Sequence, residues 1–205
     1  MTVRDLVILG AGGFAREIAW LVGRINAVSP AFRLLGFCDD APDRQSGSCG
    51  GYPLLGPIER LGEPAAFFCA IGNNRNRQAV SERAEALGHT PVTLVDPSAR
   101  LAPDVTVGPG CVIGIDAIVS VGSRLGRGVI VNHRVCVGHD VTVGDYAQLC
   151  PGVCVSGGCE IGAGALMGTL AGIIPLKRVG ADATVGAGSC ALRDVPDGTT
   201  LARVR

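Results

Sequence analysis

The chain has 205 residues and no formal net charge, because 18 basic side chains balance 18 acidic ones. This length suits two modest domains, and the lack of basic runs argues against a nucleic-acid partner. No apolar stretch approaches the roughly 20 residues of a membrane span, and no cleavable leader opens the chain. We therefore expect no membrane span and a cytoplasmic protein.

The start of the chain has the pattern of a nucleotide-binding unit. Residues 3–9 predict a buried strand, Gly10-Ala11-Gly12-Gly13 follows at once, and residues 14–22 predict a helix. Glycines let a phosphate approach the backbone, and a helix N-terminus offers free N–H groups to it. Ala15 occupies the third glycine place of the dinucleotide fingerprint, so a tight turn without a ligand remains an alternative.

Two further segments bring polar residues to the ends of predicted strands. The strand over 34–38 ends in Asp39-Asp40, where an acidic side chain often meets a ribose or a base. The strand over 65–71 runs into Gly72-Asn73, whose amides can surround a polar ligand. We expect a mobile loop over 41–51, a short helix over 56–61, a helix over 76–87 and a strand over 91–95. His89 is expected to be a solvated loop residue.

These elements predict a small Rossmann-like domain over residues 1–96. The domain is too short for a full dinucleotide fold with two mononucleotide halves. It favours a mononucleotide or nucleotide-sugar ligand and argues against a nucleotide-dependent dehydrogenase.

A six-residue repeat runs from Leu101 to Pro196 and defines a second domain over residues 97–205. From Leu101 to Ala191 every sixth residue is aliphatic, and the residue four places after each is small or β-branched with one exception, Lys177. This period predicts a parallel β-helix, in which each hexad forms a short strand and a turn. Residues 18 apart then stack at about 4.8 Å. We expect aliphatic and small residues to point inward, glycines to tolerate the turn angles, and the register to hold to Val195.

The cysteines and histidines differ in what they indicate. Nine cysteines without a Cys-x-x-Cys pair indicate neither a disulfide framework nor a zinc site. His133 and His139 occupy the third, outward place of consecutive hexads and lie on adjacent faces. Asp140 follows His139, and a carboxylate that fixes the tautomer of a neutral imidazole makes a general base. An ordinary surface His–Asp pair remains the alternative, and His133 receives no role.

The chain resembles the NeuD/PglD family of sugar acetyltransferases, left-handed β-helix proteins built from hexapeptide repeats. The matching features are Gly10-Ala11-Gly12-Gly13 with Arg16, Asp39-Asp40, Ala70-Ile71-Gly72-Asn73-Asn74, Pro97-Ser98-Ala99, the hexads and His139-Asp140. The resemblance implies a homotrimer, acetyl-CoA as cosubstrate in the groove between adjacent prisms, a nucleotide-sugar acceptor and no metal. It also implies His139 as the base and Asp140 as its support.

The same resemblance implies the remaining site residues. Gly157, eighteen residues after His139, would offer its N–H to the oxyanion and contact the cofactor. The other cofactor-binding residues would be Gln148, Thr169 and Ala187. The acceptor-binding residues would be Gly12, Gly13, Phe14, Arg16, Asp39, Asp40, Gly72 and Asn73.

The expected function is transfer of an acetyl group to the amino group of a nucleotide-linked amino sugar in bacterial glycan biosynthesis. One alternative is a sugar O-acetyltransferase. Another is a catalytically weak nucleotide-sugar-binding trimer, because residues 199–205 lack the family's Gly-x-Pro-Ala ending. A cysteine acyl-enzyme is a competing route, with candidates Cys136, Cys150 and Cys154. A hexapeptide zinc enzyme would need three prism histidines, and this prism has two.

Overall fold

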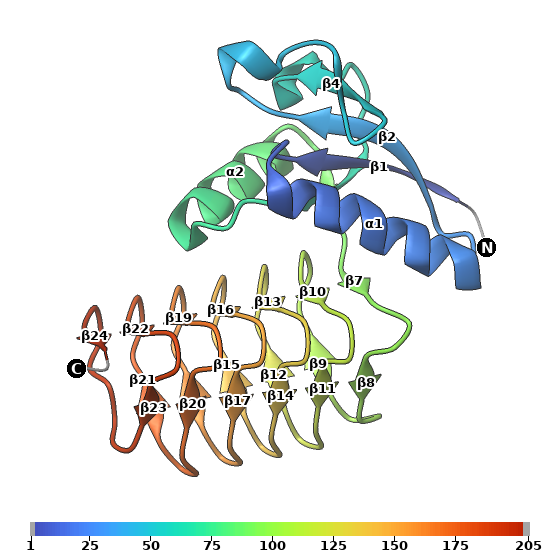
Figure 1. The fold of residues 1–205 in the computed structure, drawn as a ribbon. Coiled ribbons are helices and arrows are strands. Elements are labelled where there is room, and N and C mark those ends of the chain that lie inside the picture. The colour runs from blue at the N-terminus through green and yellow to red at the C-terminus, as the bar shows by residue number, and fades with distance from the viewer. Residues whose placement is uncertain (1–2, 203–205) are drawn as a thin grey trace. The chain divides into compact units, whose positions relative to one another are not determined.

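A computed structural model of the protein describes residues 3–202 and divides into two compact units, Met1–Pro97 and Ser98–Arg205. Figure 1 shows the elements of each unit in chain order. Neither of the two α-helices within the described residues has the length and apolar content that crossing a bilayer demands.

The first unit is built on a mixed sheet in the order β3-β4-β2-β1-β5-β6, in which only the β3–β4 pair is antiparallel. Figure 1 shows β4, β2 and β1 as successive strands of this sheet. The continuous apolar run of β1 is fully buried from Leu6 to Leu9, as is typical of a parallel strand covered on both faces. The strands are β1 Arg4–Leu9, β2 Phe32–Cys38, β3 Ser48–Cys49, β4 Tyr52–Gly56, β5 Ala66–Cys69 and β6 Thr90–Pro91, and β7 Leu94–Val95 follows them.

Two helices accompany this sheet, α1 Gly13–Val28 and α2 Asn74–Ala86. The buried side of α1 has helical spacing and consists of Ala15, Ile18, Ala19, Leu21 and Val22. The short helix expected over 56–61 is present as the 3₁₀ helix Ile58–Arg60. The expected loop over 41–51 contains a 3₁₀ helix, Pro42–Arg44, and the strand β3, and β4 follows it.

His89 is not a solvated loop residue, as its position in the sequence suggested. It is 5% exposed, and its Nδ1 accepts a hydrogen bond of 3.1 Å from the Ala65 N–H. The reason is that β6 starts at the next residue and pairs with β5, which brings the ring against the segment before β5. The imidazole thus satisfies a backbone donor.

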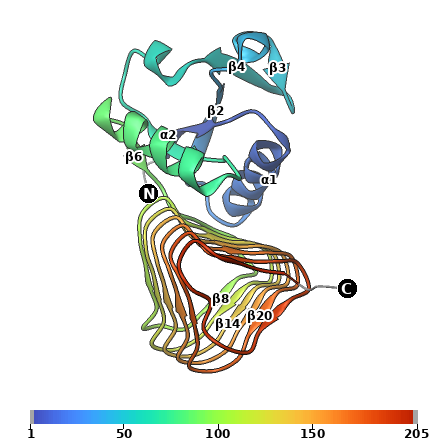
Figure 2. The same cartoon turned by 90° about the vertical axis from the view of Figure 1, so that its left-hand side faces the viewer.

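The second unit is a left-handed parallel β-helix, and the fold class expected for both units is confirmed. In Figure 2 its coils stack as triangles, one behind the other. Partners in neighbouring coils lie eighteen residues apart, as in Val112 with Ile130 and Ile130 with Gln148. The strands of its three sides have the orders β24-β22-β19-β16-β13-β10, β23-β20-β17-β14-β11-β8 and β21-β18-β15-β12-β9.

Each strand of this unit is two residues long. They are β8 Arg100–Leu101, β9 Thr106–Val107, β10 Val112–Ile113, β11 Ile118–Val119, β12 Arg124–Leu125, β13 Ile130–Val131, β14 Cys136–Val137, β15 Thr142–Val143, β16 Gln148–Leu149, β17 Cys154–Val155, β18 Glu160–Ile161, β19 Leu166–Met167, β20 Gly172–Ile173, β21 Arg178–Val179, β22 Thr184–Val185, β23 Cys190–Ala191 and β24 Thr200–Leu201. The first and fifth residues of the hexads form its core.

The second-place glycines do not serve the turn angles. Positive φ occurs at the fourth place instead, both at glycines such as Gly122 and at non-glycine residues such as Asp140. The second-place glycines lie where the next coil passes closely: a Cβ on Gly138 would lie 2.8 Å from the Gly157 nitrogen. Glycine is therefore required there by space and not by φ.

The hexad register holds to Ala191 and then shifts, against the expectation that it continues to Val195. Val195 forms a bridge with Val179, and Thr200 pairs with Thr184, so partners here are sixteen residues apart. Val195 thus takes an inward first place and is 5% exposed. The shortened segment over residues 192–194 changes which side chains the last described coil presents.

Candidate functional site

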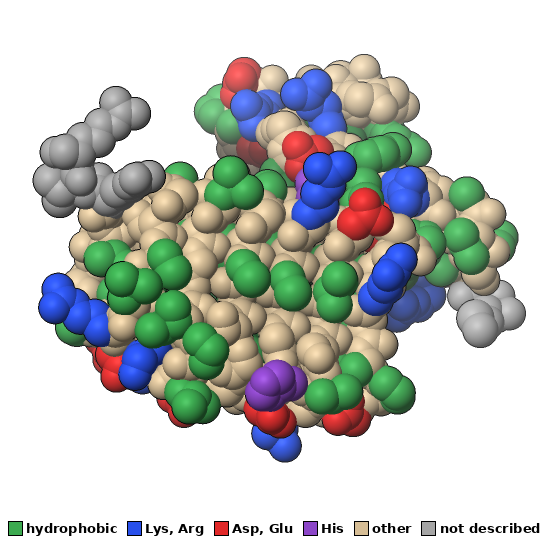
Figure 3. All heavy atoms as spheres, turned by 60° about the horizontal axis from the view of Figure 1, so that its bottom comes forward, with side chains coloured by type: hydrophobic (Ala, Val, Ile, Leu, Met, Phe, Trp, Pro, Cys, Tyr) green, Lys and Arg blue, Asp and Glu red, His purple; other side chains and the backbone are tan. Residues whose placement is uncertain are grey.

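The His139–Asp140 pair lies on the corner between β14 and β15. The imidazole Nδ1 is 2.9 Å from the Asp140 Oδ2, and the two side chains are 66% and 71% exposed. A carboxylate only accepts hydrogen bonds, so Nδ1 carries a proton, and in the neutral ring Nε2 then has a free lone pair. Figure 3 shows a histidine beside an acidic side chain on the outer surface. The pair can therefore accept a proton from a ligand in solvent.

Gly157 lies directly against the His139 ring, as the eighteen-residue spacing predicted. A Cβ added to Gly157 would collide with Nε2, Cε1 and Cδ2 of the imidazole. The Gly158 N–H donates 2.8 Å to the His139 carbonyl, which holds the two corners together. Among the described residues no acceptor takes the Gly157 N–H.

The other predicted cofactor residues do not lie on the His139 corner. Thr169 and Ala187 stack on the preceding corner, in the same column as His133, and both are exposed. The Gln148 side chain projects from β16 on another side of the prism. Its Oε1 is buried and has no hydrogen-bond donor among the described residues. One chain by itself does not bring all predicted cofactor residues together.

His133 differs from His139 in its hydrogen bonding. Its Nδ1 accepts 3.2 Å from the Ile115 N–H, so the ring is used to satisfy the backbone of the coil before it. Because the two histidines lie on different corners, they do not form a common site. In the part of the chain that the structure describes, no three His, Cys, Asp or Glu side chains cluster as metal ligands.

The cysteines proposed for an acyl-enzyme route lack an activating environment. Cys136 and Cys154 face each other across β14 and β17 on the outer surface. Partial burial, followed by the neighbouring Cys154 thiol, raises the pKa of Cys136. Burial likewise raises the pKa of Cys150, partly offset by a hydrogen bond from Gln148. A raised pKa reduces the thiolate fraction that a nucleophile needs.

The glycine turn of the first unit leads into an uncapped helix. Gly10 has φ +97°, which only glycine adopts readily. No side chain caps the N-terminus of α1, and no acidic residue lies in its first turn. A Cβ on Gly12 or Gly13 would meet nothing within 4 Å, so packing within the chain does not require glycine at either position.

Asp39 and Asp40 have different surroundings at the end of β2. The Asp39 carboxylate accepts from the Ala11 N–H at 2.8 Å and from the Ala41 N–H at 3.0 Å, and so ties the glycine turn to β2. Asp40 pairs with Arg83 at 2.7 Å, and Arg83 also lies 3.2 Å from Glu59. Both aspartates line a hollow of about 140 Å³, together with Leu9, Gly10, Cys38, Ile58, Ile71, Val80 and Arg83.

Arg83 is the site residue that sequence reasoning missed. It lies on α2, and its pairing with Asp40 depends on how α2 packs beside the sheet. An arginine in a helical sequence does not by itself indicate an ion pair with a residue that follows a distant strand. Hydrogen bonding to Asp40 raises the pKa of its guanidinium, so it is a permanent cation at this hollow.

The other predicted acceptor residues do not line this hollow. Asn73 acts as the N-cap of α2, since its Oδ1 accepts 3.0 Å from the Asn76 N–H. Phe14 packs edge-on against Phe68, with ring centroids 6.5 Å apart. Arg16 is exposed and lies over Gly50. Gly72 is also exposed.

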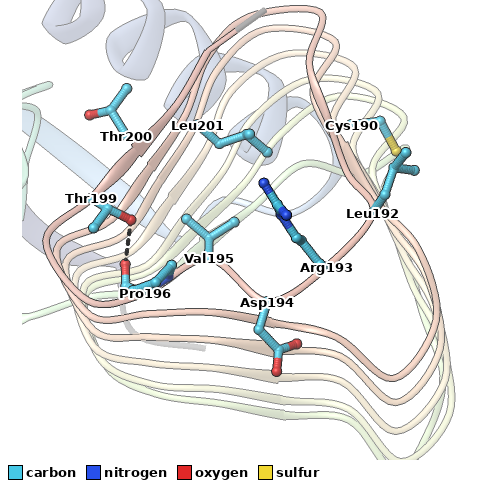
Figure 4. A pocket seen from close by; sticks show the side chains of 9 residues that line it. All are labelled: Cys190, Leu192, Arg193, Asp194, Val195, Pro196, Thr199, Thr200 and Leu201. Carbon is cyan, nitrogen blue, oxygen red and sulfur yellow. Dashed lines mark hydrogen bonds between the residues drawn. The ribbon is translucent and has the colours of Figure 1, made fainter.

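A larger hollow of about 500 Å³ lies at the last described coil and contains none of the predicted site residues. In Figure 4 its lining side chains surround the end of the prism, and Arg193 reaches toward Leu201. The hollow follows from the shortened segment over residues 192–194, because the inward residues Val195 and Leu201 form its wall. The ending at residues 199–205 falls partly outside the described residues.

The chain is similar to a known domain family and to several solved structures. The PglD N-terminal domain matches residues 5–84. No curated protein sequence matches closely enough to count as a relative. The acetyltransferase domain of PglB from Neisseria gonorrhoeae is 34% identical, with a TM-score of 0.88 over 98% of this chain and 97% of that one. That domain has also been solved in complex with acetyl coenzyme A.

Two further solved structures cover nearly the whole chain. PerB from Caulobacter crescentus, in complex with CoA and GDP-perosamine, is 29% identical with a TM-score of 0.86, covering 97% of this chain and 94% of that one. A variant of this enzyme is described as a perosamine N-acetyltransferase. WeeI from Acinetobacter baumannii is 26% identical with a TM-score of 0.87, covering 97% and 96%. The present chain therefore belongs to the PglD/NeuD-type sugar acetyltransferases and is an acyltransferase.

Proposed function

We propose that the protein transfers an acetyl group from acetyl-CoA to the amino group of a nucleotide-linked amino sugar, with His139 as general base. The observation that carries the proposal is the His139–Asp140 pair lying over Gly157. A proton acceptor stacked on a residue whose N–H has no acceptor within the described chain supports these roles. Relatives solved with acetyl coenzyme A, or with CoA and GDP-perosamine, support the choice of substrates.

Each part of this corner has a distinct task. Acetyl-CoA would supply the activated acetyl group; as the new C–N bond forms, the thioester C–S bond would break and CoA would leave as its thiolate. The His139 Nε2 takes the proton from the attacking amine, while Asp140 holds the opposite ring nitrogen protonated. The Gly157 N–H donates to the acetyl oxygen as negative charge develops there. Proton removal by a positioned base contributes roughly 10²–10⁴-fold to the rate.

The cofactor fits the polar groups of this chain. The buried Gln148 Oε1 without a donor needs a hydrogen-bonding partner, and a ligand amide or hydroxyl supplies one. Thr169 and Ala187 offer an exposed column of small residues on the neighbouring corner. We assign Gln148, Gly157, Thr169 and Ala187 to acetyl-CoA.

A homotrimer completes this site, because the assigned residues lie on different corners of one prism. The side between the two corners, here called the β14 face, presents Ile118, Cys136, Cys154, Gly172 and Cys190 outward. It carries no charge between Ile118 and Cys190, whereas the side with β15 presents Arg124, Glu160 and Arg178. An uncharged, weakly polar face flanked by both corners suits contact with a second copy.

The first unit binds the acceptor in this proposal. The uncapped N-terminus of α1 offers free N–H groups and the positive end of its dipole to a diphosphate. Gly12, Gly13, Phe14 and Arg16 lie there, and Asp39, Asp40, Gly72 and Asn73 lie at the ends of β2 and β5. Residues 1–96 are thus the acceptor domain and residues 97–205 the acyltransferase domain.

The free thiols of all nine cysteines fit a reducing cytoplasm.

The alternative of sugar O-acetylation uses the same base and differs only in the attacking atom. The solved perosamine N-acetyltransferase relative favours nitrogen. The second alternative, a nucleotide-sugar-binding trimer with weak activity, predicts binding without turnover.

A panel of nucleotide sugars tests the proposal. Each amino sugar is compared with the matching sugar that carries hydroxyl in place of the amine, with acetyl-CoA present, and mass spectrometry identifies the acetylated product. We expect product with an amino sugar and none with its hydroxyl partner. Product from the hydroxyl sugar alone would support O-acetylation. A stabilising thermal shift without any product would support the binding protein.

A further inference from the structure

A buried hydroxyl lies under the turn that carries His139. Ser123 occupies the inward fifth place of a hexad and is completely buried. Alanine, valine and cysteine fill this place in most other coils. A hydroxyl inside an apolar prism loses its water contacts, so its hydrogen bonds must come from the protein.

Both hydrogen bonds of Ser123 go to the ends of the His139 turn. Its Oγ donates 2.8 Å to the Gly138 carbonyl and accepts 3.1 Å from the Val141 N–H. These are the first and fourth residues of the turn in which His139 and Asp140 are the second and third. The serine hydroxyl thus spans the turn from within the prism.

The turns on the neighbouring corners close differently. The Val135 N–H donates directly to the Asn132 carbonyl at 3.4 Å, and the Ala147 N–H donates to the Gly144 carbonyl at 3.3 Å. No such direct bond joins Val141 to Gly138 in the described structure. The His139 turn is therefore bridged by Ser123 and is not closed by a hydrogen bond of its own backbone.

We propose that Ser123 is a positioning residue that sets the opening of this turn and so places the His139 imidazole over Gly157. Asp140 has φ +57°, which is unfavourable for a residue with a side chain and requires support from its surroundings. The Asp140 N–H donates 2.9 Å to the Val121 carbonyl, and the Gly138 N–H donates 2.8 Å to the Val155 carbonyl. The hydroxyl fixes the Gly138 carbonyl and the Val141 N–H. This inference rests on the proposed role of His139.

The chain contains a matched control for Ser123. Cys111 is also completely buried at the inward fifth place and spans a turn in the same way. Its Sγ donates 3.0 Å to the Gly126 carbonyl and accepts 3.3 Å from the Val129 N–H. That turn lies on another corner and carries no residue assigned to catalysis. Removing either bridge leaves one carbonyl and one N–H of its turn without that partner. Only the Ser123 bridge spans the turn that carries His139.

The experiment compares Ser123→Ala, Ser123→Cys and Cys111→Ala in acetyl transfer by the full-length protein. We expect Ser123→Ala to lower kcat by about 10- to 10²-fold while both KM values stay within about threefold. Ser123→Cys keeps both bonds with a larger atom, as Cys111 does, and should give an intermediate kcat. Cys111→Ala should keep kcat within about twofold of the unsubstituted protein, even where its melting temperature falls as much as that of Ser123→Ala.

A spectroscopic measurement separates this inference from the proposed function. The ring resonances of His139 are compared in Ser123→Ala and Cys111→Ala by nuclear magnetic resonance, with His89 and His133 as internal references. We expect only Ser123→Ala to shift or broaden the His139 signals. Ser123→Ala with kcat and His139 signals like those of Cys111→Ala would overturn the inference and leave His139 as base. If Ser123→Ala does not fold, Ser123→Val also removes the hydroxyl and matches the valines that fill this place in other coils; unchanged kcat and unchanged His139 signals in that protein overturn the inference.

Discussion

At the scale of single residues, the stacking of His139 on Gly157 decides what the corner can do. The eighteen-residue spacing predicts this contact, because inward and outward positions repeat with the coil. The sequence does not predict the Asp39 carboxylate on the Ala11 and Ala41 N–H groups, nor the Asp40–Arg83 pair. Both depend on side-chain directions in segments that are distant in sequence, and no repeat relates those segments.

The first prediction concerns Gly157→Ala. Alanine occupies the same third place at Ala163, Ala181 and Ala187, so the backbone accepts it and the melting temperature should change little. The new methyl group would occupy the position of the His139 ring. We expect kcat to fall at least about tenfold through displacement of the base. The matched control Ala163→Ser, on a corner without His139, should be fully active. Full activity of Gly157→Ala would contradict the stacked arrangement.

At the scale of elements, the hexads determine the prism almost completely, since each coil repeats the same inward pair. The expectation that the hexad register continues to Val195 fails, because the register shifts after Ala191. The segment over 192–194 shortens the last described coil, and the pairing of Thr200 with Thr184 shows the change. The first unit has no repeat, so its short strands β3 and β4 and the burial of His89 follow from packing alone.

The second prediction concerns the start of α1. Gly12→Ala and Gly13→Ala fill open space, so neither should unfold the protein. Alanine at Gly13 should raise stability by about 0.5–1 kcal/mol because it is the better helix former. We nevertheless expect each to raise the KM for the nucleotide sugar, since the methyl group occupies the space of the diphosphate.

Kinetics with varied acceptor and fixed acetyl-CoA check this prediction. Gly23→Ala, within the same helix and also facing open space, is the control for a helix effect. It should raise stability without changing the KM for the acceptor. An unchanged acceptor KM in Gly12→Ala and Gly13→Ala would remove the α1 N-terminus from the acceptor site.

At the scale of the whole molecule, the assigned cofactor residues lie on different corners of one prism. The proposed acetyl-CoA site therefore requires neighbouring copies of the chain. The uncharged β14 face lies between those corners, and its outward residues include Ile118 and Cys154. Charge placed on this face should oppose assembly, because a carboxylate would lose water without a partner.

The third prediction follows from this face. Ile118→Asp should convert the proposed trimer to monomer and abolish acetyl transfer, as measured by sedimentation together with an activity assay. Thr142→Asp places the same charge on the side with β15, where Thr142 points outward, and should leave the trimer intact. A trimeric Ile118→Asp protein, or a wild-type monomer with full activity, would contradict the proposed site between copies.

The most direct test of the account is His139→Asn in acetyl transfer to the preferred amino-sugar nucleotide. Asparagine keeps a polar side chain on the corner but accepts no proton at neutral pH. We predict that kcat falls by about 10²–10⁴-fold while the trimer and the KM for the acceptor are preserved. A kcat reduced by less than about tenfold in an intact trimer would contradict His139 as the general base.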